Sequence, residues 1–266
     1  LLLNDKYSEE SVNTDMHTYF HMPLKRADYE SACNLLDMNF AVSQTARKKF
    51  GSIALIDLSQ DGAVIPSTKF EQMLKRDVIR SAVLDLVEFS LKKYASRYLH
   101  DGGAFKLYEK YTRRDACQLL NWEHDDSSTV YGYRIKFGTC PIFVTYNKDE
   151  DISRSTQYED RFIDPQYFSW MTRSNLTIAS TEVQQIINAD DLELDIHLFI
   201  KKGDNEGSDF YYMGKVHPES YRQTTIENDN GDLLPIVNFV FKLENPVRED
   251  LYDYLESDCM NVMNND

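Results

Sequence analysis

The sequence predicts an α+β fold, with a helical N-terminal section at residues 1–103 followed by a curved, mostly antiparallel sheet or small barrel at residues 104–266. Apolar residues recur every three or four positions between Pro66 and Tyr98, which is the helical period. After Val130 the period changes to two, and short apolar runs alternate with turns rich in glycine and asparagine. Two glycines, Gly102 and Gly103, interrupt the helical pattern, so we place the domain boundary there.

Three helices are predicted before the sheet begins. The first covers 28–40, and the longest covers 66–98, with Pro66, Ser67 and Thr68 as its start. One face of the long helix is apolar, whereas the opposite face carries lysines, arginines and Glu88. That charged face is either solvated surface or a contact to DNA or to a partner domain. A third helix is predicted over 112–120, with Thr112 as its N-cap.

The sheet section begins with a predicted hairpin. Its strands cover 130–137 and 141–146, and Gly138 and Thr139 form the turn. Further strands are predicted at 191–202, 208–216, near 221–226 and at 233–243, with helices at 181–188 and 246–255. Short strands joined in this way are typical of a curved sheet or small barrel.

Composition restricts the class of protein. The chain has 266 residues, of which 42% are hydrophobic and 27% charged, as is usual for a folded domain. Because no apolar stretch is long enough to span a membrane and the chain starts without Met, we expect a soluble, cytoplasmic fragment of a longer protein. The four cysteines have no metal-binding spacing, so we expect reduced thiols and no cofactor or metal.

The charge distribution is uneven. The net charge is −15, and residues 181–266 contribute 6 basic and 19 acidic side chains to it. Such an excess disfavours DNA binding by the last third, since affinity for DNA depends on cations that neutralise phosphates. It also favours an alternative function, a protein-interaction or dimerisation module that docks on a basic surface.

Common catalytic signatures are missing from the sequence. It contains no phosphate loop, no H-E-x-x-H motif and no G-x-S-x-G motif, so we expect no catalysis by this chain. One polar array alternates with apolar residues along the strand at 191–202 and consists of Asp191, Glu193, Asp195 and His197. A solvated strand face is the simpler interpretation of the array, and a metal-dependent nuclease site is the alternative.

Aromatic and arginine side chains are concentrated between Leu107 and Arg173. This mixture is used for stacking bases and holding phosphates, although aromatic residues on strands also form cores. In the segment YEDRFIDPQYFSWMTRS, Asp160 lies between Tyr158 and Phe162 and shortly before Trp170. The pattern is compatible with both a nucleic-acid site and a core with its surface.

The phrases CPIFVTY, YEDRF, FSWM, SDFYYMGKV and LLPIVNFVFKLENPV resemble a domain found C-terminal to superfamily-two helicases in bacteria. The resemblance is close from about Leu107 to the end. It implies an ATP-dependent Type IV restriction enzyme that cuts DNA containing methylated cytosine, often with a phospholipase-D-type nuclease before the helicase. It further implies that this domain is the target reader, similar in fold to the SRA and PUA-like family, and that residues 1–103 connect it to the motor.

On this basis we expect DNA, a helicase and a nuclease domain in cis, and possible homodimers as partners, and no membrane. A flipped base needs flat walls and a polar group that reads its edge. The expected stacking walls are Tyr133 and Tyr146, and the expected acceptor for the cytosine amino group is Asp160. The remaining candidates are Phe143 and Trp170 for the 5-methyl group, and Arg161 and Arg173 for flanking phosphates. For each of these residues, core packing or an internal ion pair of Asp160 with an arginine is the alternative.

Overall fold

The computed structural model describes residues 7–20, 25–60, 63–97, 103–147 and 160–257. The chain divides into two compact units. The helical unit contains Leu1–Ala104 and Cys117–Ser128, and the sheet unit contains Phe105–Ala116 and Thr129–Asp266. Each unit is described by itself below.

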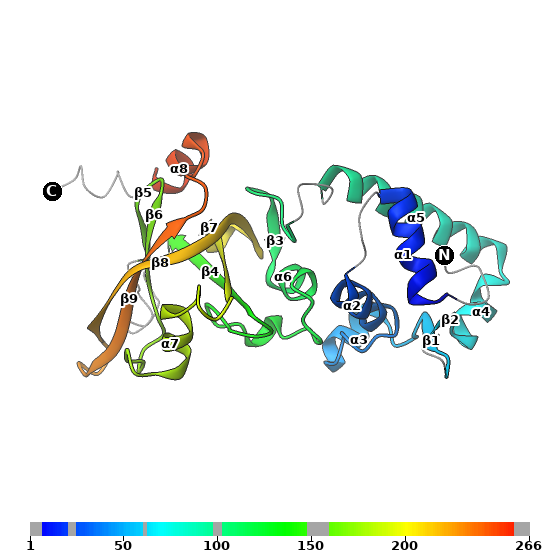
Figure 1. Cartoon of the computed structure of the whole chain (residues 1–266), viewed down its shortest axis with the longest axis horizontal. Helices are drawn as coiled ribbons and strands as arrows, with labels where there is room; N and C mark the ends of the chain where they lie inside the picture. Colours follow the sequence, from blue (N-terminus) through cyan, green and yellow to red (C-terminus); the bar gives the residue numbers. More distant parts are fainter. Residues whose placement is uncertain (1–6, 21–24, 61–62, 98–102, 148–159, 258–266) are drawn as a thin grey trace. The chain divides into compact units, whose positions relative to one another are not determined.

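The helical unit is built from short helices and one long helix (Figure 1). The elements are α1 (Glu9–Phe20), α2 (Arg26–Leu36), α3 (Gln44–Phe50), β1 (Ile56–Leu58), β2 (Val64–Pro66), α4 (Thr68–Leu74) and α5 (Asp77–Arg97). The helix predicted over 66–98 is therefore two helices. Ser67 caps the first of them, because its side chain accepts a hydrogen bond from the Phe70 backbone N–H at 3.2 Å. The chain leaves that helix after Leu74 and starts the long helix at Asp77.

The sheet unit contains one sheet with the strand order β4-β7-β8-β9-β6-β5, and β3 also pairs with β8. Its elements are β3 (Lys110–Thr112), β4 (Thr139–Asn147), β5 (Arg161–Asp164), β6 (Tyr167–Met171), α7 (Thr181–Ile187), β7 (Asp195–Gly203), β8 (Asp209–Glu227), β9 (Leu233–Leu243) and α8 (Glu249–Glu256). Among the described strands, only β4 and β7 pair in parallel. The α+β class with a curved, mostly antiparallel sheet is confirmed.

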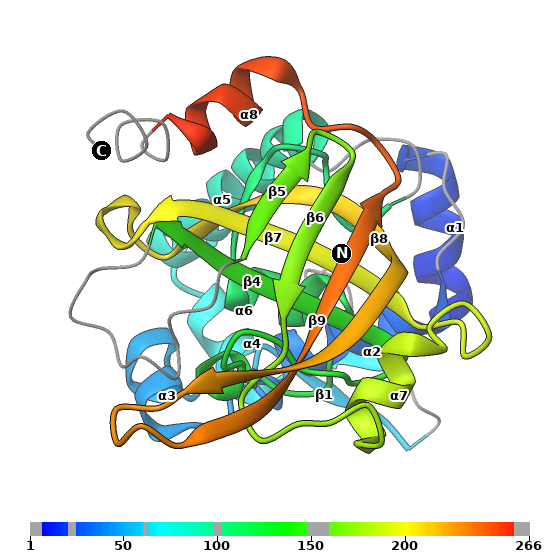
Figure 2. The ribbon, with the colours of Figure 1, turned by 90° about the vertical axis from the view of Figure 1, so that its left-hand side faces the viewer.

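The long strand β8 joins the two halves of the curved sheet. Its first residues pair with β7, and residues Val216–Glu227 pair with β9. As a result β5, β6 and β9 lie in front of β4 and β7 (Figure 2), and the space between them is filled by the main core. Phe168, Phe239 and Leu198, each fully buried, belong to this core. We call the opposite side of β5, β6, β9 and the second part of β8 the outer face.

The helix α6 (Arg113–Leu119) follows β3 directly. Thr112 Oγ1 accepts a hydrogen bond from the Asp115 backbone N–H at 3.0 Å, and Asp115 Oδ2 accepts one from the Thr112 backbone N–H at 2.9 Å. This reciprocal pair confirms the predicted N-cap and resembles a capping box.

Three predicted strands differ in the structure. Residues 130–137 form no strand and make only isolated bridges from Tyr133 to Ile142 and from Lys136 to Thr139. The positive φ angles of Gly132, Phe137 and Gly138 explain this, since they interrupt an extended backbone. In addition, the runs predicted at 208–216 and 221–226 belong to the single strand β8. Among the described residues, no helix is long and apolar enough to cross a membrane.

Candidate nucleic-acid interface

Two of the predicted pocket residues, Tyr133 and Trp170, meet in the core. Their ring centroids are 4.9 Å apart in an edge-to-face arrangement, and the side chains are 1% and 3% exposed. Burial raises the pKa of the Tyr133 hydroxyl, so the group stays neutral. A base could therefore stack on Tyr133 only after displacing its core neighbours.

Arg173 belongs to the same cluster. Its guanidinium lies 4.7 Å from the centroid of the Tyr133 ring and forms an ion pair with Glu182 at 2.5 Å. The sequence predicts a phosphate contact for Arg173, whereas the structure shows a charge already paired inside the protein. The carboxylate that pairs with Arg173 is thus that of Glu182.

Phe143 lies on the other side of the sheet from Tyr133. Its neighbours in β4, Ile142 and Val144, face the main core, so Phe143 faces away from it. There its ring stacks on Phe199 with centroids 4.7 Å apart. Phe143 and Tyr133 therefore cannot form walls of one pocket.

Tyr146 and Asp160 make structural contacts. The Tyr146 hydroxyl donates a hydrogen bond to Glu256 and accepts one from the Phe162 backbone N–H at 3.1 Å. Asp160 is 8% exposed, and its Oδ1 accepts a hydrogen bond from the Met171 backbone N–H at 2.9 Å. Tyr158, expected beside Asp160, lies outside the described residues.

The polar array at 191–202 does not form one exposed face. Asp191 and Glu193 precede β7 in turns, and Asp195 pairs with Lys215 at 2.6 Å. His197 is buried, with Nδ1 3.0 Å from the Tyr212 hydroxyl oxygen, and burial lowers its pKa to about 4. His197 is therefore neutral at pH 7. No group of three or more His, Cys, Asp or Glu side chains suited to a metal occurs in the described part of the chain.

Arg161 lies on the outer face and borders a pocket of about 370 Å³. We call this pocket the outer-face pocket. It is lined by Arg161, Ile163, Ser169, Ser220, Tyr221, Arg222, Asn238 and Val240. Its size falls within the range of about 300–1000 Å³ that is usual for small-molecule sites.

The strand register places these residues in two rows. The first row crosses four neighbouring strands. It consists of Arg161 in β5, Ser169 in β6, Val240 in β9 and Ser220 in β8, each paired with the next. Asn238 and Arg222 pair in the neighbouring row. The two arginines thus lie on strands separated by three strand spacings, or about 14 Å.

A bulge in β8 determines which of its side chains face outward. The register between β8 and β9 shifts between Pro218 and Ser220, so that Glu219 is the extra residue. Because side chains alternate along a strand, this insertion places Ser220 and Arg222 on the outer face, in register with Val240 and Asn238. The bulge therefore brings the basic side chain of Arg222 to the pocket.

The two pocket arginines differ from other cations of the sheet unit. Neither Arg161 nor Arg222 forms a side-chain hydrogen bond or ion pair with another described residue, and both are exposed. By contrast, Arg173, Lys215 and Arg248 all pair with carboxylates. Between the arginines, the Asn238 amide donates a hydrogen bond to Ser169 Oγ at 3.0 Å. The pocket therefore offers a polar floor with two available guanidinium groups, an arrangement suited to an anion.

Most of this site could not be found in the sequence. The predicted candidates were taken from 107–173, where aromatic residues and arginines are dense, and only Arg161 among them lines the pocket. Ser220, Arg222 and Asn238 come from strands more than fifty residues later. The strand around 221–226 was predicted, but its outward residues depend on a bulge beside Pro218, a residue type that sheets accept mainly at edges and bulges.

Family models match both parts of the chain. Residues 105–255 match the model described as "Domain of unknown function (DUF3427)", and residues 1–98 match "Domain of unknown function (DUF8090)". The chain belongs to the DUF3427 family. No curated protein matches it significantly.

Solved structures of other proteins align with this DUF3427 chain, but with low scores. "DNA modification-dependent restriction endonuclease AspBHI" is 13% identical with a TM-score of 0.32, and the alignment covers 44% of this chain and 35% of that one. The MspJI restriction endonuclease in complex with an oligonucleotide is 10% identical with a TM-score of 0.32, and the alignment covers 42% of this chain and 31% of that one. The sulfur-binding and SRA domains of ScoMcrA with phosphorothioated DNA are 10% identical with a TM-score of 0.33, and the alignment covers 96% of this chain and 85% of that one. The chain thus spans about a third of the first two proteins, and scores this low do not establish a shared fold.

Proposed function

We propose that the sheet unit is a DNA target-recognition domain and that the outer-face pocket is its DNA contact. The observation that carries the proposal is the pair of exposed arginines without partners among the described residues, on either side of a polar pocket. The strands that carry them lie about 14 Å apart, and the major groove is about 12 Å wide. Arg161 and Arg222 can therefore hold phosphates of two strands, and such contacts fix the orientation of a duplex.

Base recognition would take place on the pocket floor. Ser169, Ser220 and Asn238 supply hydrogen-bonding groups for a base edge, and Val240 and Ile163 supply apolar contacts for a methyl group. We propose that a cytosine carrying a 5-methyl group is flipped into this pocket, as the resemblance to methylcytosine readers implies. Flipping costs a few kcal/mol, which the backbone contacts would offset.

The proposal includes no chemistry by this chain. In the enzyme class that the sequence resembles, cleavage and translocation belong to a nuclease and a helicase. We propose that such domains act in cis and that this chain supplies target choice. A protein-interaction module is the second candidate function, and a groove in the helical unit supports it.

The salt dependence of binding tests the DNA contact. Two phosphate contacts would release counterions, so the logarithm of the binding constant should fall with the logarithm of salt concentration with a slope of about −2. Fluorescence anisotropy of a labelled duplex, titrated with the full chain at several salt concentrations, measures this slope. Absence of binding at the lowest salt concentration, or affinity independent of salt, would contradict the proposal.

A further inference from the structure

The helix α5 exposes apolar side chains on more than one side. Val78 is 80% exposed, and Leu86 and Phe89 are each 62% exposed. Burial of such large apolar side chains is favourable, because water otherwise surrounds their hydrophobic surface. The exposed surface of α5 thus has the composition of an interface.

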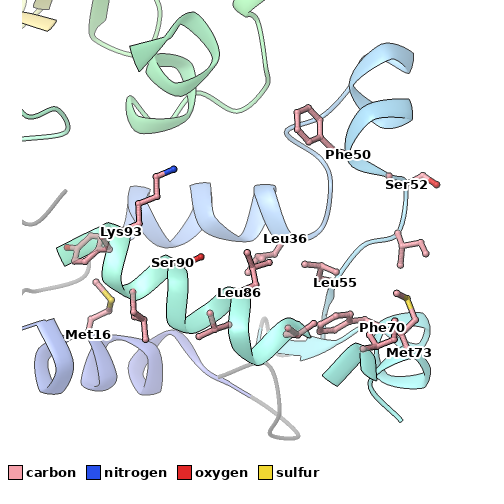
Figure 3. A pocket seen from close by; sticks show the side chains of 17 residues that line it. Met16, Leu36, Phe50, Ser52, Leu55, Phe70, Met73, Leu86, Ser90 and Lys93 are labelled. Carbon is pink, nitrogen blue, oxygen red and sulfur yellow. The ribbon is translucent and has the colours of Figure 1, made fainter. Parts of the chain in front are cut away.

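One side of α5 borders a groove of about 1150 Å³ within the helical unit (Figure 3). From Ile79 through Val83, Leu86 and Ser90 to Tyr94, the α5 residues that line it follow the helical period. This stretch of α5 is about 24 Å long at 1.5 Å per residue. Met16 of α1 and Leu36 of α2 contribute to the other walls, which are also apolar.

The size and shape of the groove favour a helix over a small molecule. Its volume exceeds the range of about 300–1000 Å³ in which small-molecule sites fall. A groove that follows four turns of a helix matches the apolar stripe of a second helix, with side chains at i, i+3, i+4 and i+7. The few polar groups in the lining, among them Ser52, Ser90 and Lys93, leave little to orient a small polar ligand.

Charges at the two ends of the groove restrict the occupant further. Lys93 lines one end, and Phe50 lies at the opposite end (Figure 3). There Lys49 Nζ lies 5.3 Å from the centroid of the Phe50 ring. Cations at both ends attract acidic residues, which complementary interfaces place opposite them. A second copy of this chain is disfavoured, since each copy has a net charge of −15.

We propose that this groove binds an amphipathic helix of a partner protein or domain, with an apolar stripe and acidic flanking residues. The proposal is independent of DNA binding by the sheet unit, because every lining residue belongs to the helical unit.

A designed peptide tests the proposal. The probe is a fluorescein-labelled helical peptide of about 16 residues, with leucine in the i, i+3, i+4, i+7 stripe and glutamate at the flanks. The matched probe has lysine in place of every glutamate. We expect the full chain to bind the glutamate peptide at least about tenfold more tightly than the lysine peptide, measured by fluorescence anisotropy.

Two variants of α5 provide the control. Leu86→Glu and Phe89→Glu make the same change at positions of equal exposure, but only Leu86 lines the groove. We expect Leu86→Glu to weaken binding of the glutamate peptide at least about tenfold and Phe89→Glu to leave it nearly unchanged. Far-UV circular dichroism checks that both variants stay folded.

Three results would overturn the proposal: no binding of the glutamate peptide, equal binding of both peptides, or equal effects of the two variants. Self-association in sedimentation experiments that Leu86→Glu abolishes would also overturn it, because the occupant would then be a second copy.

Discussion

Replacing Arg161 and Arg222 together by alanine is expected to abolish most of the DNA affinity of the chain. A hydrogen bond to a charged group contributes about 1.5–3 kcal/mol, so the loss of two such contacts should weaken binding about 100-fold or more. Both side chains are exposed and make no side-chain contact with a carboxylate among the described residues, so the fold should tolerate the change. Anisotropy titrations at low salt concentration measure the affinity, and thermal unfolding measures the stability.

Arg248→Ala is the matched control for this pair of substitutions. It also removes an exposed arginine from the sheet unit, but Arg248 pairs with Asp250 and does not line the outer-face pocket. We expect at most a small change in DNA affinity. An equal loss in the control and in the double variant would mean that the chain binds DNA through diffuse charge, without a defined site.

Trp170→Ala is expected to destabilise the sheet unit by about 3–5 kcal/mol, as is typical when a buried tryptophan is truncated. Trp170 is 3% exposed and packs against Tyr133, Phe239 and Phe241, with ring centroids 4.9–5.9 Å away. Chemical denaturation followed by circular dichroism measures the loss. The control Ile163→Ala, at a side chain 55% exposed on the outer face, should change the free energy of unfolding by about 0.5 kcal/mol or less.

This substitution also separates two locations for the base. If Trp170 senses a methyl group, its removal should impair binding of modified DNA while leaving the stability nearly unchanged. If Trp170 belongs to the core, as the structure indicates, its removal should lower the free energy of unfolding. Unaltered unfolding together with lost discrimination between modified and unmodified DNA would locate the base at Tyr133 and Trp170, and not in the outer-face pocket.

The sequence predicted the elements better than the surfaces they form. The strand 233–243 agrees with β9, because an uninterrupted apolar run between turns leaves few alternatives. The predicted strand 130–137 failed, since its alternating tyrosines suggested a strand while Gly132 and Gly138 take positive φ values. At this position the turn geometry outweighs the strand propensity of the tyrosines.

The candidate site was harder to predict from the sequence than the strands were. Aromatic density between 107 and 173 indicated stacking on bases, but Tyr133, Phe143 and Trp170 form core contacts instead. Residue type alone cannot distinguish a buried ring from an exposed one when both lie on strands. The outer-face pocket depends on the pairing of four strands and on one bulge, and these are properties of the fold.

The acidic character of the chain is compatible with a small DNA contact. At about 0.1 M salt, charges separated by more than about 10 Å are largely screened, so distant carboxylates repel DNA weakly. Glu219 is exposed next to Ser220, but it does not line the outer-face pocket. The net charge of −15 should nevertheless slow association and restrict strong binding to low salt concentrations.

The most direct test of the central claim compares three matched duplexes, which are unmodified or contain 5-methylcytosine or 5-hydroxymethylcytosine. We expect the full chain to bind the 5-methylcytosine duplex most tightly in low-salt anisotropy titrations. Burying one methyl group contributes about 0.8 kcal/mol, which corresponds to a preference of about fourfold, and a closely fitting pocket would increase it. Equal affinity for all three duplexes would contradict recognition of modified cytosine, and no binding to any of them would contradict a DNA-binding function.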